Sequence, residues 1–446
     1  MMCEQLGQPR ADALCEALLT TEPSVSVRLN PFKPFAPCPP PLAEAPVPWC
    51  PDAFYLRQRP PFTFDPLLHA GAYYVQDASS MFLAEILRQH APEARCVLDL
   101  CAAPGGKSTL LRSILSPDSL LVCNEPIRQR AQVLAENMTK WGHPSTIVTQ
   151  SYPADFTDLC DVFDVVVADV PCSGEGMFRK DEVAVAEWSR SNVELCWKRQ
   201  REIIRDVWPA LRPGGLLVYS TCTFNRQENE DNVQWIAAEL EAEILSVATK
   251  PEWGIEGHYH FFPDQVRGEG QFMAALRKQP DTQTRSTQHV ASARTSRGAG
   301  PRFTFSFPEW LSGDFAFFRE GDVCYAFPQA HLPLREYLAK HLNVLSQGIC
   351  MAELRGHDWL PAHSLAMSTA LSRGAFPEAE LSYESALAYL RREAIQVDAP
   401  RGIVLVTFQG LPLGFVKNLG TRANNLYPQE WRIRSTHTTP FTLFRD

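Results

Sequence analysis

Five short apolar runs alternate with amphipathic segments between residues 94 and 240, and this alternation limits the possible folds more than any other feature of the chain. The runs are ARCVLDL, SLLVCNE, STIVTQ, FDVVVADV and GLLVYSTC, and each stops where polar or glycine-rich residues begin. Segments with helical periodicity lie between the runs or follow the last one, at residues 107–115, 128–141, 188–211 and 227–240. Strands that alternate with helices in this way predict a parallel sheet with helices on both faces. The expected fold class is therefore α/β.

The remaining sequence divides into regions of different composition, because 446 residues are too many for one ordinary core. Residues 38–61 are rich in proline, within an N-terminal region 1–70 that precedes the sheet domain 71–278. Thr, Ser, Gln, Arg and Gly dominate residues 279–301, which predicts a linker. Residues 302–394 mix aromatic runs with helical segments, as a small α+β domain would. Strand-like runs in residues 395–446 predict a mainly β module close to the lower size limit for independent stability.

Composition indicates a soluble, cytoplasmic protein. Hydrophobic residues make up 45% and charged residues 21%, and no apolar run reaches the roughly 20 residues that cross a membrane. Residues 1–18 lack the basic flank and apolar stretch of a secretory signal. The 13 cysteines are scattered without a CxxC pair, which argues against a zinc site and against a disulfide framework. We expect a monomer that binds neither metal nor membrane.

Positive charge is concentrated in two places although the net charge is -9. One patch spans residues 277–302 and contains Arg277, Lys278, Arg285, Arg294, Arg297 and Arg302. The other spans residues 401–446 and contains Arg401, Lys417, Arg422, Arg432, Arg434 and Arg445. Such patches can hold the phosphates of a nucleic acid, and taken alone they fit solvated surface charge equally well.

A glycine-rich turn follows the first predicted strand in VLDLCAAPGGKSTLL and opens directly into a helix. Small residues let a cofactor approach the main chain, and a helix N-terminus offers free N–H donors. The pattern is not that of a Walker phosphate loop. The turn lies at the carboxyl end of a strand, where open α/β sheets bind ligands. The candidate cofactor-binding residues are Cys101, Ala102, Ala103, Pro104, Gly105, Gly106 and Lys107.

The second predicted strand ends in Glu125, where a carboxylate can accept hydrogen bonds from ribose hydroxyls. The turn and Glu125 together indicate an adenosine-containing ligand, which could be a dinucleotide or S-adenosylmethionine. The fourth predicted strand favours S-adenosylmethionine because it ends in ADVPCSGEG, an acid followed by Pro-Cys. Asp169 in this motif could reach either the cofactor or a target base.

Two cysteines end neighbouring predicted strands, Cys172 after the fourth and Cys222 after the fifth. Either one alone is more simply interpreted as a buried thiol. Two at matched positions beside a cofactor turn favour a function. A thiolate that attacks carbon 6 of cytosine activates carbon 5 toward a methyl donor, and this chemistry requires a flipped or unpaired base in a pocket.

Six motifs in the same part of the chain resemble the NOL/NOP/Sun (RsmB/NOP) family of RNA cytosine-5 methyltransferases. They are YYVQDASSM (73–81), DLCAAPGGKS (99–108), NEP (124–126), DVPCSGEGMFRK (169–180), LRPGGLLVYSTCTFNRQENE (211–230) and FFPDQVRGEGQFMAALRK (261–278). The resemblance implies a Rossmann-like class I methyltransferase sheet, an RNA-binding family extension at residues 1–70, and S-adenosylmethionine as the cofactor. It also implies that RNA is the substrate, because DNA cytosine methylases lack the second cysteine.

The resemblance assigns roles to single residues. Cys222 corresponds to the attacking nucleophile and Cys172 to the cysteine that assists product release, while Asp169 and Glu125 join the glycine turn at the cofactor. Two positions depart from the family pattern. Val170 stands where alanine is usual, and Ser151 stands where an acid usually lies near the adenine, so that a serine hydroxyl would bind the ring instead.

The C-terminal segment GFVKNLGTRANNLYPQEWRIR (414–434) resembles the PUA-like RNA-binding module of RsmF-type enzymes that modify 16S ribosomal RNA. This resemblance makes ribosomal RNA, free or within the small subunit, the expected partner. Two alternatives remain. The chain could methylate cytosine in transfer RNA, or it could be an RNA-binding ribosome assembly factor that keeps the methyltransferase fold without catalysis.

Overall fold

The computed structural model describes residues 2–34, 38–255, 259–280, 308–356, 358–435 and 440–444. Five parallel strands form the centre of its largest sheet, in the order β9-β8-β5-β6-β7. They coincide with the five apolar runs, so the predicted α/β sheet is confirmed. Their bounds are Cys96–Asp99 for β5, Leu120–Asn124 for β6, Thr146–Thr149 for β7, Phe163–Asp169 for β8 and Leu211–Thr221 for β9.

Antiparallel strands extend the sheet at both edges, and the alternating pattern did not predict them. Beyond β9 come β12 (Gln271–Lys278) and β10 (Ala242–Leu245), with the short β11 (His260–Phe261) paired to β12. At the opposite edge, β15 (Val344–Gln347) pairs antiparallel with β7. Strand β15 comes from the region predicted as a separate α+β domain, so that region is built into the methyltransferase sheet.

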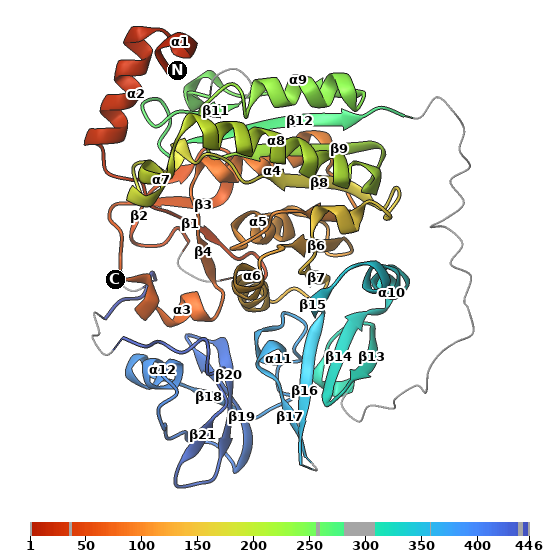
Figure 1. The fold of residues 1–446 in the computed structure, drawn as a ribbon. Coiled ribbons are helices and arrows are strands. Elements are labelled where there is room, and N and C mark those ends of the chain that lie inside the picture. Colours follow the sequence, from red (N-terminus) through yellow and green to blue (C-terminus); the bar gives the residue numbers. More distant parts are fainter. Residues whose placement is uncertain are drawn as a thin grey trace.

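Helices cover both faces of the sheet, as its pattern predicts (Figure 1). Alternate strand residues point to opposite faces, so Val97 and Val165 belong to one core cluster while Leu98 and Val166 belong to the other. The first cluster is closed by α4 (Leu83–His90), α5 (Gly106–Ile114) and α6 (Arg128–Trp141). The second is closed by α8 (Arg190–Val207), α9 (Glu230–Glu239) and α10 (Leu332–His341).

The described part of the N-terminal region contains three α-helices and a sheet in the order β2-β3-β1-β4. This sheet ends with β4, which lies beyond the predicted boundary at residue 70. The elements are α1 (Met2–Leu6), α2 (Gln8–Thr20), β1 (Ser26–Leu29), β2 (Ala43–Val47), β3 (Cys50–Leu56), α3 (Pro66–His69) and β4 (Tyr73–Val75).

Two small sheets follow the methyltransferase sheet in the chain. The first, β13-β14-β16-β17, packs against α11; the second, β18-β19-β20-β21, packs with α12 and begins before the predicted boundary at residue 395. In the first sheet the strands are β13 (Phe315–Glu320), β14 (Val323–Pro328), β16 (Ile349–Arg355) and β17 (Asp358–Pro361), and α11 is His363–Met367. In the second sheet they are β18 (Glu378–Glu380), β19 (Gly402–Phe408), β20 (Leu411–Asn418) and β21 (Ala423–Asn425), and α12 is Tyr383–Leu390. The mainly β character of the C-terminal module is thus confirmed.

The N-terminal and C-terminal parts share one hydrophobic core (Figure 1). Leu67 of α3 and Tyr73 of β4 lie in the same buried cluster as Leu387 of α12, Leu413 of β20 and Leu443. Asp65 links the two parts directly, because its Oδ2 accepts hydrogen bonds from the Tyr73 hydroxyl at 2.8 Å and from the Leu443 N–H at 2.9 Å. The C-terminal module therefore does not form a core of its own.

Candidate active site

The cofactor turn lies at the carboxyl end of β5 and leads into α5. Gly105, directly before the helix, has φ of +115°, a conformation that favours glycine. The Ala102 N–H donates to the Asn124 carbonyl at 2.8 Å, and the Asn124 side chain donates to the Leu100 carbonyl at 3.1 Å. These bonds hold the turn beside the end of β6 and leave the first N–H groups of α5 available to a ligand.

Two buried carboxylates lie next to this turn. Glu125, after β6, is 1% exposed, and its Oε1 accepts the Ile127 N–H at 3.1 Å. Asp99 ends β5, where its Oδ2 accepts the Ser108 hydroxyl at 2.7 Å and its Oδ1 has no hydrogen-bond partner among the described residues. Burial raises the pKa of Asp99 to about 7. The sequence pattern assigned no role to Asp99, although it is the acid that precedes the glycine turn.

Ser151 lies at the end of β7, as predicted, but its hydroxyl contacts protein. The Ser151 Oγ accepts the Asn343 backbone N–H at 3.0 Å, directly before β15. Its own N–H donates to the Asn124 Oδ1 at 3.0 Å. Ser151 thus anchors the edge strand β15 to the sheet, a role that only the tertiary structure reveals.

An ion pair joins the cofactor turn to β8. The Lys107 ammonium lies 2.8 Å from Asp169 Oδ2, while Asp169 Oδ1 accepts the Ser220 hydroxyl at 2.6 Å. Burial is the largest single influence on the pKa of Lys107 and lowers it, but the charge and hydrogen bond of Asp169, together with Asp99 and Cys222, raise the pKa overall. Lys107 is therefore a stable cation at the point where β5, β8 and β9 meet.

The two predicted cysteines lie side by side. Their Sγ atoms are 2.9 Å apart, and the Cys222 N–H donates to the Cys172 Sγ at 3.2 Å. The hydrogen bond to Cys222, followed by burial, raises the pKa of Cys172 well above that of an ordinary thiol. The raised pKa favours the thiol form of Cys172, and either sulfur can be the donor of the hydrogen bond between them. The pair is asymmetric because the Cys172 sulfur also accepts the backbone N–H of Cys222.

A buried carboxylate, Glu228, organises the chain beneath the cysteines. It accepts the Ser173 N–H at 3.1 Å and the side-chain amides of Asn225 and Gln200, each at 2.7 Å. Burial raises the pKa of Glu228. Glu228 therefore fixes the loop after Cys172 to the loop after Cys222. Glu228 lies in one of the sequence motifs, but the motif does not predict this role because the three donors come from three separate segments.

The loop after Cys172 is also tied to the loop after Cys222 by backbone contacts. The Gly176 N–H donates to the Cys222 carbonyl at 2.9 Å, and Glu175 accepts the Phe224 N–H at 2.9 Å and the Trp188 indole at 2.9 Å. A Cβ at Gly176 would lie 2.4 Å from the Gly270 carbonyl oxygen, so only glycine fits there. The loop continues into α7 (Glu182–Glu187).

The predicted basic patches have different fates. In the first, Arg277 donates to the carbonyls of Gly214 and His90, and Lys278 donates to those of Trp208 and Leu211; the other four residues of this patch and most of the predicted linker lie outside the described residues. In the second, Arg401, Arg422 and Arg434 are exposed, while Arg445 lies outside the described residues. Only the second patch presents described cations to solvent.

No helix within the described ranges is both long and apolar enough to cross a membrane. The same ranges contain no group of three or more His, Cys, Asp or Glu side chains placed to hold a metal ion.

Three family profiles match the chain. They are described as 16S rRNA methyltransferase RsmB/F, over residues 84–277, as the N-terminal domain of 16S rRNA methyltransferase RsmF, over residues 1–78, and as the methyltransferase RsmF PUA domain, over residues 376–433. The matches cover the sheet with its cysteine pair and both parts of the shared core.

Full-length relatives and solved structures agree with the profiles. Ribosomal RNA small subunit methyltransferase F of Klebsiella pneumoniae is 32% identical over 86% of this chain and 84% of its own length, and that of a Shewanella species is 31% identical over 86% and 85%. A methyltransferase homologue from Pyrococcus horikoshii (24% identity, TM-score 0.52) covers 61% of this chain and 92% of its own. NSun6 from the same organism (18% identity, TM-score 0.53) covers 63% and 97%. At these low sequence identities, the comparison shows only that this chain and the two solved structures have similar folds.

Proposed function

Because the chain belongs to the RsmB/F family of 16S rRNA methyltransferases, we propose that it methylates carbon 5 of a cytosine in small-subunit ribosomal RNA, with S-adenosylmethionine as methyl donor. The observation that carries the proposal is the pair of thiols 2.9 Å apart beside the Lys107–Asp169 ion pair. Both features lie at the strand ends where an α/β sheet binds its ligand.

The residues of the cofactor turn fit S-adenosylmethionine. Residues 101–107 would face its amino acid portion, with the N–H groups at the start of α5 as donors, and Glu125 would accept its ribose hydroxyls. Asp99 has a buried oxygen without a partner among the described residues, as a site for a cationic ammonium group requires. When bound, the cofactor supplies an electrophilic methyl group.

The two cysteines divide the work on the base. Cys222 forms a bond to carbon 6 of the cytosine, which makes carbon 5 nucleophilic enough to accept the methyl group. A base then removes the carbon 5 proton, the bond between Cys222 and carbon 6 breaks, and the ring double bond is restored. The sulfur of Cys172 lies 2.9 Å from that of Cys222, and Cys172 assists this release.

Cysteine variants test the mechanism. We expect Cys222→Ala to abolish methylation and Cys172→Ala to accumulate a covalent protein–RNA adduct, because release would be blocked after attack. The adduct appears as a slowly migrating band on a denaturing gel. Cys350→Ala, on the distant strand β16, is the matched control and should behave as the wild type. Normal turnover by Cys222→Ala would refute the covalent route.

Bisulfite sequencing tests the substrate. Total RNA from a strain that lacks this protein should lose 5-methylcytosine in 16S ribosomal RNA and regain it when the wild-type gene is restored, but not when the Cys222→Ala gene is restored. Loss of the mark in transfer RNA instead would identify a transfer RNA methyltransferase. An unchanged methylation pattern together with defective subunits would identify an assembly factor.

A further inference from the structure

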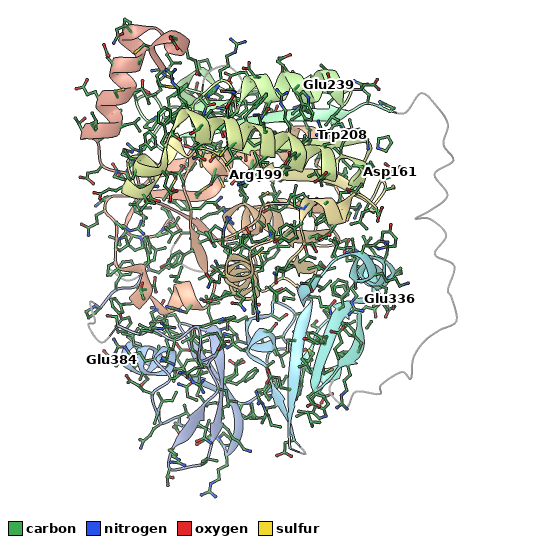
Figure 2. The ribbon with its side chains drawn as sticks, viewed as in Figure 1. Asp161, Arg199, Trp208, Glu239, Glu336 and Glu384 are labelled. Carbon is green, nitrogen blue, oxygen red and sulfur yellow. The ribbon has the colours of Figure 1, made fainter. Side chains whose placement is uncertain are left out.

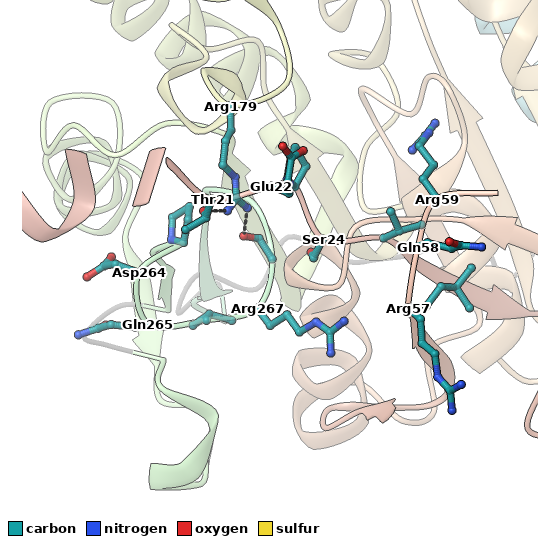
Figure 3. Close-up of a pocket in the computed structure, with 16 residues that line it drawn as sticks. Thr21, Glu22, Ser24, Arg57, Gln58, Arg59, Arg179, Asp264, Gln265 and Arg267 are labelled. Atoms are coloured by element: carbon teal, nitrogen blue, oxygen red, sulfur yellow. Dashed lines mark hydrogen bonds between the residues drawn. The ribbon is translucent and has the colours of Figure 1, made fainter. Parts of the chain in front are cut away.

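A groove of about 700 Å³ opens between the N-terminal region and the loop that precedes β12 (Figure 3). One side consists of residues 21–25 after α2 and residues 56–59 after β3. The other consists of residues 263–268 and Arg179. Four arginines line it: Arg57, Arg59, Arg179 and Arg267. Its volume lies within the range of sites that hold a small molecule, which is about the size of a short chain segment.

Arg57 and Arg59 are the arginines of the groove that form no ion pair with a carboxylate of the described ranges. Both are exposed, and the Arg59 guanidinium also lies 5.7 Å from the centre of the Phe62 ring. Arg179 and Arg267 are already neutralised, by Glu269 at 2.8 Å and by Glu44 at 2.5 Å.

The acids of the groove do not cancel this charge. Asp264 pairs with Arg10 of α2, and Glu22 is the other acid in the lining. Polar groups complete the lining, because Gln58 is exposed and the Ser24 hydroxyl is buried without a hydrogen-bond partner among the described residues. The lining therefore suits an anionic chain that also carries hydroxyl or base groups.

Arg179 and the residues before β12 connect the groove to the strand ends that carry the two cysteines. Arg179 belongs to the loop after Cys172 and donates to Glu269 at 3.0 and 2.8 Å, to the Gly268 carbonyl at 2.9 Å and to the Thr21 hydroxyl at 2.7 Å. Directly after Glu269, Gly270 packs against the backbone of Gly176. Strand β12 then begins beside the end of β9, with Phe272 opposite Thr221. A strand of RNA whose target base enters the cysteine site thus passes close to this groove.

We propose that the groove holds the sugar–phosphate backbone of the RNA beside the target nucleotide, with Arg57 and Arg59 on its phosphates. This rests on the proposed function for the RNA substrate. The recognition is by phosphate charge and positions the strand without reading its sequence. An acidic protein segment is the competing occupant, and the test below separates the two.

The test uses the full chain and naked 16S ribosomal RNA from a strain that lacks this protein. Arg57→Ala/Arg59→Ala should bind this RNA about 10-fold more weakly in filter binding at moderate salt, and the plot of log affinity against log salt should flatten by about 1.4 for two lost contacts to a single strand. The KM for RNA should rise while kcat and the KM for the cofactor stay unchanged. Arg57→Lys/Arg59→Lys should restore the salt slope, because phosphate contacts need charge and not a guanidinium.

Lys198→Ala/Arg199→Ala is the matched control, since it removes two exposed cations from α8, where Figure 2 labels Arg199. It should match the wild type. Unchanged RNA affinity and salt slope in Arg57→Ala/Arg59→Ala would overturn the proposal, as would a defect seen only with assembled subunits, which would indicate a protein partner. RNA binding is measured without catalysis. A wild-type protein that fails to methylate cytosine would therefore refute the proposed function, but the effect of the arginine substitutions on RNA binding could still be interpreted.

Discussion

Asp99 is a buried carboxylate whose protonation depends on the fold. Burial has the largest influence on its pKa and raises it to about 7, while the Ser108 hydroxyl and Lys107 act in the opposite direction and Asp169 and Glu125 raise it further. An aspartate in an unfolded chain has a pKa near 3.9. Between these two values the folded protein holds a proton that the unfolded chain has lost.

This difference fixes the sign of one pH dependence. Because the folded state binds more protons, the contribution of Asp99 to the free energy of unfolding decreases as the pH rises from about 4 to about 7, by at most about 1.4 kcal/mol per pH unit. In cofactor-free protein, Asp99→Asn should remove this contribution, so that the stability gap between variant and wild type changes steadily across the window. Urea denaturation at several pH values measures it. A constant gap would show that Asp99 does not titrate there.

At the scale of elements, the loop after Cys172 depends on the close approach of two backbones. Gly176→Ala would place a Cβ 2.4 Å from the Gly270 carbonyl oxygen and strain the bond from the Gly176 N–H to Cys222. We expect kcat to fall at least about 10-fold, since displacing groups by an ångström costs that much or more. Gly321→Ala is the control: its turn between β13 and β14 is open, with φ of +59°, so it should lose about 1 kcal/mol of stability and no activity. Steady-state kinetics with thermal unfolding separates the two effects, and an unchanged kcat for Gly176→Ala would contradict the expectation.

The elements also show how far the sequence predicts this fold. The five parallel strands have strong local signals, because each is an apolar run bounded by polar residues, and their order brings Cys172 and Cys222 to one edge. Strand β12 could not be placed by the same reasoning, since its insertion beside β9 depends on pairing between distant segments. The same holds for β15, which follows the predicted linker in the sequence and pairs with β7. The N–H of Asn343, directly before β15, donates to the Ser151 hydroxyl oxygen.

At the scale of the whole molecule, the N-terminal region and the C-terminal module depend on each other. Leu443 is fully buried in their shared core, and its N–H binds Asp65. Removing the C-terminal module would therefore also expose the core of the N-terminal region, so a truncation cannot isolate RNA binding by this module. Point substitutions test the coupling more cleanly.

Leu443→Ala should lower the free energy of unfolding by about 3 kcal/mol, as expected when a fully buried leucine is truncated. It should also increase hydrogen exchange in residues 25–75, because the core holding them would loosen. Leu419→Ala is the matched control, since Leu419 is 38% exposed, and it should change neither quantity measurably. Hydrogen exchange read by mass spectrometry locates the effect. Loosening confined to residues 376–444 would show that the two parts fold independently.

The shared core also has a consequence for how the chain is made. Residues 25–75 leave the ribosome early, yet the partners that close their core extend to residue 444. At about 5–20 residues per second, translation separates the two by roughly 20 to 70 s. During that interval the methyltransferase sheet can form around β5 to β9, while the core that contains Val27, Leu56 and Phe62 stays incomplete. The N-terminal region is thus synthesised before this sheet, but its core is completed only after the C-terminal module has been made.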